Sequence, residues 1–104
     1  MTYEKRYYVY ILSSLSGTLY IGVTSNLEKR VWQHKEYVFE GFTADYDVDR
    51  LLYWEVYDLV GRAIAREKQL KGWRREKKIK LFERTNPLWK DLAAEWYAEV
   101  CGRK

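Results

Sequence analysis

Among the side chains of this sequence that can transfer protons or hold charged groups, five draw attention: Tyr10, Tyr20, Arg30, His34 and Glu67. A phenol or an imidazole can donate or accept a proton, and a guanidinium can bind two oxygens of an anion at once. A carboxylate can hold a divalent cation. Such a set suits acid–base chemistry beside an anionic group, provided that the fold brings the five side chains together.

The two tyrosines lie in segments that alternate in polarity, residues 7–12 and 18–23. This alternation predicts two antiparallel strands, and the stretch from Ser13 to Gly17 suits the turn between them. Pairing the apolar residues across the turn places Tyr10 opposite Tyr20, so both phenols would lie on one face. The apolar face would carry Val9, Ile11, Leu19, Ile21 and Val23, and the other face Tyr8, Tyr10, Leu12, Tyr20 and Gly22.

A helix is predicted to begin after Ser25 or Asn26, either of which suits an N-cap, and to run to about Tyr37. Arg30 and His34 lie four residues apart on this helix and therefore share a face. If the helix packs beside the hairpin, these two side chains can approach the tyrosines.

The rest of the chain predicts one more strand and three more helices. Residues 38–49 have the composition of an irregular stretch, and residues 51–57 are rich in the aromatic and β-branched types that favour a strand. Asn86-Pro87 is typical of a helix start, an N-cap followed by proline at the first helical position. The predicted helices cover residues 61–73, about 75–82 and about 87–100.

These elements predict an α+β fold, a small three-stranded antiparallel sheet flanked by helices. Their order along the chain is strand, strand, helix, strand, helix, helix, helix. The 104 residues suffice for a single domain with one core, at about residues 7–92.

Glu67 lies beside the apolar side of its predicted helix, four residues after Ala63 and three before Leu70. A carboxylate in that position is costly unless it is paired, opens onto a cleft or holds a cation. Lys71, one turn later, can form an ion pair with it. The helix pattern alone leaves both the ion pair and the cation site open.

Composition favours a packed globule, since 47% of the residues are apolar and 17% are aromatic. The single cysteine, Cys101, cannot form an internal disulfide, which fits a reducing cytoplasm. No apolar run approaches the roughly 18 residues of a membrane span, and the N-terminus has no apolar signal core. We therefore expect a soluble cytoplasmic protein.

The net charge of +4 permits nucleic-acid binding, and the basic residues are concentrated in one segment. Seven lie between Lys71 and Arg84, against the two acidic residues Glu76 and Glu83. A solvated surface helix would show the same run. The residues expected to contact nucleic acid are Lys71, Arg74, Arg75, Lys77 and Lys78.

Taken together, these motifs resemble the GIY-YIG endonuclease superfamily, and most closely its small, free-standing bacterial members. The resemblance covers about residues 7–92. It rests on Tyr8-Val9-Tyr10 and Tyr20-Ile21-Gly22, on the helix from Lys29 to His34, on Arg66-Glu67-Lys68 and on the segment Asn86 to Trp89. The first tripeptide departs from the motif, because Tyr8 and Val9 replace glycine and isoleucine. A tyrosine restricts the close approach of a phosphate to the backbone that glycine permits.

The resemblance implies a site in which Tyr10 and Tyr20 are the two motif tyrosines, Arg30 the helix arginine and Glu67 the single metal-binding glutamate. One Mg²⁺ or Mn²⁺ ion at Glu67 would stabilise the leaving group, and Arg30 would bind nonbridging phosphate oxygens. Tyr20 would be the general base, Tyr10 would orient water or substrate, and His34 would be an acceptor or proton shuttle.

The function implied is metal-dependent hydrolysis of phosphodiester bonds in DNA, in preference to RNA. The alternatives are a nucleic-acid-binding module with the same fold and little or no activity, and, with least support, a protein-interaction domain. The substrate is open between a branched junction, a repair intermediate and a substrate delivered by a protein partner. We expect no appended recognition domain, and either a monomer or a homodimer.

Three further side-chain sets have simpler interpretations. Asn86 matches a late asparagine of some relatives loosely, and a helix cap suffices for it. Glu55 could support the site, although a cross-strand ion pair is the simpler role. The tryptophans fall largely on apolar stripes, with Trp73, beside the basic run, the one that could stack on an unpaired base.

Overall fold

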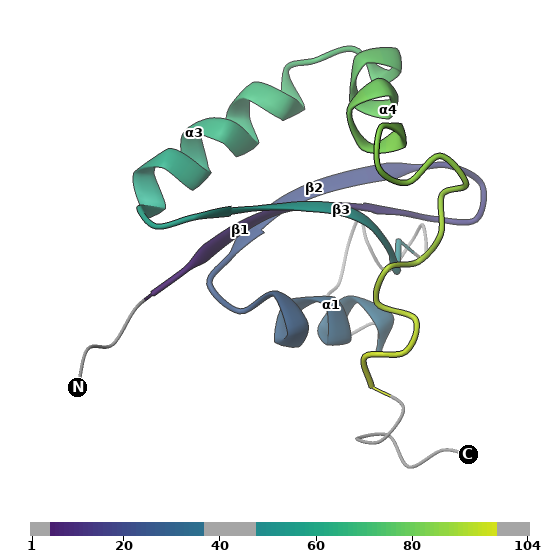
Figure 1. Cartoon of the computed structure of the whole chain (residues 1–104), viewed down its shortest axis with the longest axis horizontal. Coiled ribbons are helices and arrows are strands. Elements are labelled where there is room, and N and C mark those ends of the chain that lie inside the picture. Colours follow the sequence, from purple (N-terminus) through teal and green to yellow (C-terminus); the bar gives the residue numbers. More distant parts are fainter. Residues whose placement is uncertain (1–4, 37–47, 98–104) are drawn as a thin grey trace.

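The computed structural model describes residues 5–36 and 48–97, and three antiparallel strands form its centre (Figure 1). The strands are β1 (Tyr7–Ser13), β2 (Leu19–Thr24) and β3 (Arg50–Tyr57), arranged in the order β2-β1-β3. β1 is therefore the central strand, and Val9 to Leu12 within it are fully buried. The predicted α+β class and three-stranded antiparallel sheet are confirmed.

Helices cover both faces of the sheet (Figure 1). On one face lie α3 (Val60–Lys71) and α4 (Arg75–Glu83). The opposite face is covered by α1 (Leu27–Lys35) and by the segment that follows Arg84. The alternation of β1 divides the core accordingly. Val9 and Ile11 pack with the α3 side, and Tyr10 and Leu12 with the α1 side.

The hairpin has the predicted faces but a different register. Tyr10 lies opposite Gly22, and Tyr20 lies opposite Leu12, so the prediction that Tyr10 faces Tyr20 directly was wrong. The cause is the turn. The backbone of Gly17 has φ +98°, a conformation that suits a turn, and the Ser14 hydroxyl accepts a hydrogen bond from the Thr18 amide. The turn thus lies one residue later than expected, and the pairing shifts by two residues without exchanging faces.

The helix starts agree closely with the sequence. Asn26 is the N-cap of α1, and its side chain accepts a hydrogen bond from the Lys29 amide. The Thr24 hydroxyl accepts from the Asn26 amide and ends β2 immediately before the helix. α1 ends at Lys35, two residues before the predicted end at Tyr37, and α3 and α4 lie within two residues of their predicted bounds. The predicted irregular stretch over 38–49 lies mostly outside the described residues.

The helix predicted from residue 87 to about 100 is not present in the part of the chain that the structure describes, which ends at Tyr97. Trp89 has φ +57°, a left-handed conformation that an α-helix cannot contain. Asn86 is not a helix cap. It is 4% exposed, and its side chain bonds to the carbonyls of Leu52 and Lys90 and to the Lys90 amide. These bonds hold an irregular segment against β3, where its backbone polar groups find partners in the sheet.

Further contacts attach this segment to the α1 face. The Asp91 carboxylate accepts hydrogen bonds from the amides of Leu51 and Ala93 and pairs with Lys35 of α1. The Leu92 amide donates to the Leu51 carbonyl.

Among the described residues, no helix is long and apolar enough to cross a membrane.

Candidate active site

Tyr10 projects from the central strand across its neighbour β2. Its side chain is fully buried and lies over Gly22. A Cβ atom at residue 22 would lie 2.5 Å from the Tyr10 hydroxyl oxygen and 2.6 Å from Cζ, distances that no side chain tolerates. The missing side chain at Gly22 therefore makes the room in which the Tyr10 phenol reaches toward the outer edge of the sheet.

Tyr20 and His34 meet Tyr10 in this space. The ring centroids lie 6.3 Å apart for Tyr10 and Tyr20, 5.9 Å for Tyr10 and His34, and 5.2 Å for Tyr20 and His34. The Tyr10 hydroxyl lies 3.2 Å from His34 Nε2. Three of the five residues singled out from the sequence thus form one aromatic cluster between the sheet and α1, although the tyrosines are diagonal neighbours on the sheet.

Arg30 completes the α1 side of the cluster. It lies one turn before His34, and its side chain hydrogen-bonds to the Tyr10 hydroxyl. Arg30 can only donate, so the Tyr10 oxygen accepts from it. In the hydrogen bond between the Tyr10 hydroxyl and His34 Nε2, the donor depends on the tautomer of the His34 ring.

Burial keeps Tyr10 and His34 neutral. Burial is the main cause that raises the pKa of Tyr10 well above its ordinary range, with the Tyr20 phenol adding to it and Arg30 opposing it. The pKa of His34 falls to about 4, first because the ring is buried and second because Arg30 lies close to it. Arg30 by itself lowers the pKa of Tyr10, but burial outweighs it.

Glu67 reaches the cluster from the opposite face of the sheet. α3 packs against β1 and β2, and the negative charge of Glu67 raises the pKa of Tyr10, so the carboxylate lies within electrostatic range of that hydroxyl. Its side chain is 16% exposed and forms an ion pair with Lys71, with Oε2 and Nζ 3.0 Å apart. The ion pair that the sequence left open is therefore present. The ring contacts and hydrogen bonds thus join Tyr10, Tyr20, Arg30 and His34, and Glu67 acts on Tyr10 through its charge.

The donor set near the cluster suits a hard, well-hydrated cation. Within the described residues, no group of three or more histidines, cysteines, aspartates or glutamates could enclose a metal ion. Glu67 alone offers one carboxylate on a regular helix. Mg²⁺ keeps several waters and commonly takes one or two carboxylates together with substrate phosphates, so a single carboxylate fits that ion.

Glu55 forms a second charged network, which the sequence did not reveal. It accepts two hydrogen bonds from Arg66 of α3, both 2.9 Å long, and one each from the hydroxyls of Tyr53 and Tyr57, at 2.6 and 2.7 Å. Although burial raises the pKa of Glu55, the bonds from Arg66 and the two tyrosines outweigh it and lower that pKa. In place of the expected cross-strand ion pair, Glu55 of β3 pairs with Arg66, the residue before Glu67 on α3. This pair holds α3 in one rotation about its axis against the sheet.

The basic residues expected to contact nucleic acid, Lys71, Arg74, Arg75, Lys77 and Lys78, lie from the end of α3 to the first turn of α4. Arg75 lies beside the β1–β2 turn, because its Nη2 would be 3.1 Å from a Cβ atom at Gly17. The ring of Trp73 carries the Lys77 ammonium 4.3 Å from its centroid and the Arg66 guanidinium 5.3 Å from it. Cation–π contacts therefore occupy the tryptophan that the sequence suggested for base stacking.

Comparison with known proteins agrees with this geometry. Residues 6–80 match the family described as the GIY-YIG catalytic domain. A UPF0213 protein of Staphylococcus saprophyticus is 33% identical over 77 residues, which cover 74% of this chain and 94% of that protein. A UPF0213 protein of Natronomonas pharaonis is 36% identical over 75 residues, covering 72% and 88%. The chain therefore belongs to the GIY-YIG family, a family of nucleases.

A solved structure shows the same fold. The solution NMR structure of a UPF0213 protein from Bacillus halodurans aligns with a TM-score of 0.54 and 23% identity, over 86% of this chain and 97% of that one. At this identity the likeness speaks for the fold alone. The small GIY-YIG type expected from the sequence is thus confirmed, while the names of these relatives specify no reaction.

Proposed function

We propose that this protein is a metal-dependent endonuclease that hydrolyses phosphodiester bonds in DNA. The observation that carries the proposal is the convergence of the Tyr10, Tyr20 and His34 cluster with Arg30 and with the charge of Glu67. These groups arrive from β1, β2, α1 and α3. A domain that only binds nucleic acid has no evident need to bring all five to one place.

The environments of the two tyrosines support different roles for them. Tyr10 is buried, keeps its proton and is hydrogen-bonded to His34, so it orients its neighbours. Tyr20 is half-buried and lies against the neutral His34 ring, which leaves it as the general base that activates water. His34 is neutral at neutral pH because burial lowers its pKa, and it would be a hydrogen-bond acceptor or a proton shuttle.

The remaining two residues supply charge. Arg30 is half-buried at the Tyr10 hydroxyl and can bind nonbridging oxygens of the phosphate in a bidentate manner. Glu67 would hold one Mg²⁺ or Mn²⁺ ion, which stabilises negative charge on the leaving oxygen when bound. The basic residues from Lys71 to Lys78 would hold the backbone of the DNA, and repair or processing of branched or damaged DNA is the role that we propose.

A cleavage assay tests this function. Purified protein is incubated with supercoiled, branched and single-stranded DNA in Mg²⁺ or Mn²⁺, and then with chelator. Cleavage should require the metal and should fall by at least about a hundredfold in Glu67→Gln, the order of magnitude lost when one charge-stabilising group is removed. Glu36→Gln changes an exposed carboxylate at the end of α1 and serves as the matched control. Persistent cleavage by Glu67→Gln would show that the proposed site is not responsible.

One observation favours a second candidate function, a nucleic-acid-binding module without activity. Glu67 is already paired with Lys71, so the carboxylate has a role that needs no metal. Binding to DNA that weakens steeply with salt, without cleavage of any of the three substrates in either metal, would favour this candidate.

A further inference from the structure

A shallow groove crosses the α1 face of the sheet at the end away from the β1–β2 turn. It consists of three hollows of about 720, 540 and 310 Å³. The first and second share Val56, and the second and third share Asn26, Glu28 and Trp96, so the hollows are neighbours on the surface. We call this row of hollows the aromatic groove.

Aromatic side chains line the groove. Trp54 and Val56 of β3 lie opposite Tyr10 and Tyr8 of β1 and therefore face the α1 side of the sheet. Trp54 is nevertheless 37% exposed and Val56 47% exposed. The lining aromatic residues are Tyr8, Trp32, Trp54, Trp96 and Tyr97. Exposed apolar groups gathered in one depression are typical of a binding surface.

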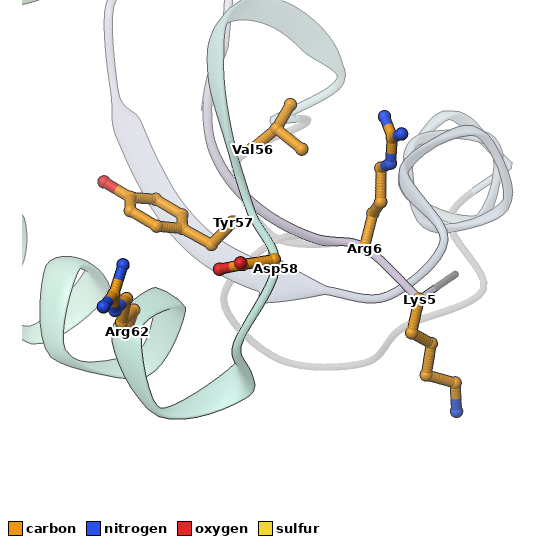
Figure 2. Close-up of a pocket in the computed structure, with 6 residues that line it drawn as sticks. All are labelled: Lys5, Arg6, Val56, Tyr57, Asp58 and Arg62. Carbon is orange, nitrogen blue, oxygen red and sulfur yellow. The ribbon is translucent and has the colours of Figure 1, made fainter. Parts of the chain in front are cut away.

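Basic side chains accompany the aromatic ones. Lys5, Arg6 and Arg62 line the first hollow, and Lys29 lines the third. Figure 2 shows Arg6 and Val56 on the side of the sheet away from α3, while Tyr57 extends toward α3. The acidic residues in the lining are Asp58 and Glu28. The first hollow is thus net basic, the middle of the groove is aromatic, and Lys29 and Glu28 balance each other in the third hollow.

This combination fits one class of ligand. Aromatic rings on a sheet face stack on bases only when those bases are unpaired, and flanking cations follow the phosphates. A peptide would use the aromatic floor but has no general need for a basic end, whereas duplex DNA hides its base faces.

The groove also adjoins the candidate active site. Tyr8 and Tyr10 point to the same face of β1, two residues apart, and Tyr8 lines the second hollow. Tyr8 stands where the family motif has glycine, so the departure from the motif adds a ring to the groove.

We propose that the aromatic groove binds an unpaired stretch of nucleic acid next to the active site. The site would then act on DNA that has a single-stranded segment, an inference that rests on the proposed endonuclease function for its catalytic meaning. Binding to the groove itself needs neither metal nor cleavage, and can therefore fail or succeed independently of that function.

The test measures the affinity for a fluorescent ten-nucleotide oligothymidine, in the presence of chelator, by anisotropy. Trp54→Ala should weaken binding about tenfold, the loss expected for one stacked base. Leu15→Ala changes a side chain that is 87% exposed on the β1–β2 turn and is the matched control. A duplex of ten base pairs should be affected by Trp54→Ala much less than the single strand.

A second variant tests the basic end without altering the aromatic floor. The double substitution Lys5→Gln and Arg6→Gln should make the salt dependence of oligothymidine binding less steep, by about 1.4 in the slope of log K against log salt. Lys90→Gln, an exposed lysine outside the groove, should leave the slope unchanged.

Unchanged binding of oligothymidine by both Trp54→Ala and the double variant would overturn the proposal. It would also be overturned if Trp54→Ala altered only the sedimentation mass of the protein, because the groove would then be an interface between copies of the chain. Cleavage assays on the same variants separate the two ideas. If Glu67→Gln loses metal-dependent cleavage but binds oligothymidine normally, both the groove proposal and the endonuclease proposal are supported. If the wild type binds oligothymidine but cleaves no substrate, only the endonuclease proposal is contradicted.

Discussion

The Tyr10 hydroxyl and His34 Nε2 are hydrogen-bonded across 3.2 Å, and both side chains are buried, at 0% and 4% exposure. The pair joins the central strand to α1, and it is neutral at both ends. Its protonation state therefore links the stability of the domain to the chemistry of the candidate site.

Acid should weaken the fold through His34. The pKa of its ring is about 4 in the folded protein against an ordinary value of 6.5, so between these values the unfolded chain binds more protons. The stability that depends on neutral His34 is complete above pH 6.5 and is lost as the pH falls toward 4. Urea unfolding of the wild type and of His34→Gln at several pH values measures this. The difference in unfolding free energy between them should shrink over that interval, and a difference independent of pH would contradict the buried neutral ring.

A side chain at residue 22 should displace Tyr10. In Gly22→Ala the new Cβ would lie 2.5 Å from the Tyr10 hydroxyl oxygen in a tightly packed core, and overpacking of this kind costs about 1 to 3 kcal/mol. Urea unfolding measures the loss. Gly61→Ala is the control, because a Cβ there meets nothing within 4 Å on a helix, where alanine is favoured by about 0.5 to 1 kcal/mol over glycine. Equal effects of the two substitutions would show that the phenol does not lie over Gly22.

Loss of the Glu55 charge should loosen α3 from the sheet. Glu55→Gln leaves the Arg66 guanidinium, whose side chain is only 22% exposed, without its carboxylate. The expected cost is about 2 kcal/mol in unfolding free energy, between those of an exposed and a buried ion pair. Glu76→Gln, an exposed carboxylate in the first turn of α4, should change stability by less than about 0.5 kcal/mol. Hydrogen exchange should show faster opening of α3 in the Glu55 variant, and unchanged exchange would argue against this role.

Removal of Lys71 should make Glu67 a better ligand for a cation. The ion pair occupies one carboxylate oxygen at 3.0 Å, and Lys71→Met removes both this competitor and a nearby positive charge. Mn²⁺ affinity, measured by calorimetry or electron paramagnetic resonance, should rise about two- to fivefold, as expected for an ion pair worth about 0.5 to 1 kcal/mol. Lys68→Met, on the same helix but not paired with Glu67 in this structure, should have a smaller effect. No Mn²⁺ binding in either variant would speak against Glu67 as the metal ligand.

The sequence predicted the parts of the fold that depend on local patterns. Alternation placed Tyr10 and Tyr20 on one face of the hairpin, and the cap at Asn26 fixed the start of α1. The predicted register was wrong because the register depends on the conformation of the turn at Gly17, which alternation does not specify. The helix start predicted at Asn86-Pro87 was wrong for a related reason. A capping asparagine and one that bonds to a distant strand look the same in sequence, and only the contact with Leu52 separates them.

The contacts between distant elements could not be predicted in the same way. Glu55 and Arg66 pair across eleven residues, but nothing in the spacing of a strand and a helix indicates which side chains will meet. The convergence of Glu67 with Tyr10 from opposite faces of the sheet is likewise a property of the assembled fold. For Glu67 and Tyr10 the family resemblance supplied the expectation of a common site, and for Glu55 and Arg66 nothing predicted the pair.

Because Tyr10 fits closely over Gly22, the residue types that these two positions can hold depend on each other. A lineage that acquires any side chain at the glycine must also give up the large ring opposite, because the space holds one or the other. Among relatives of this chain the two positions should therefore change together. A sequence that retains the second tripeptide glycine but has a small residue in place of Tyr10 would be expected to have lost the selection that keeps this space open.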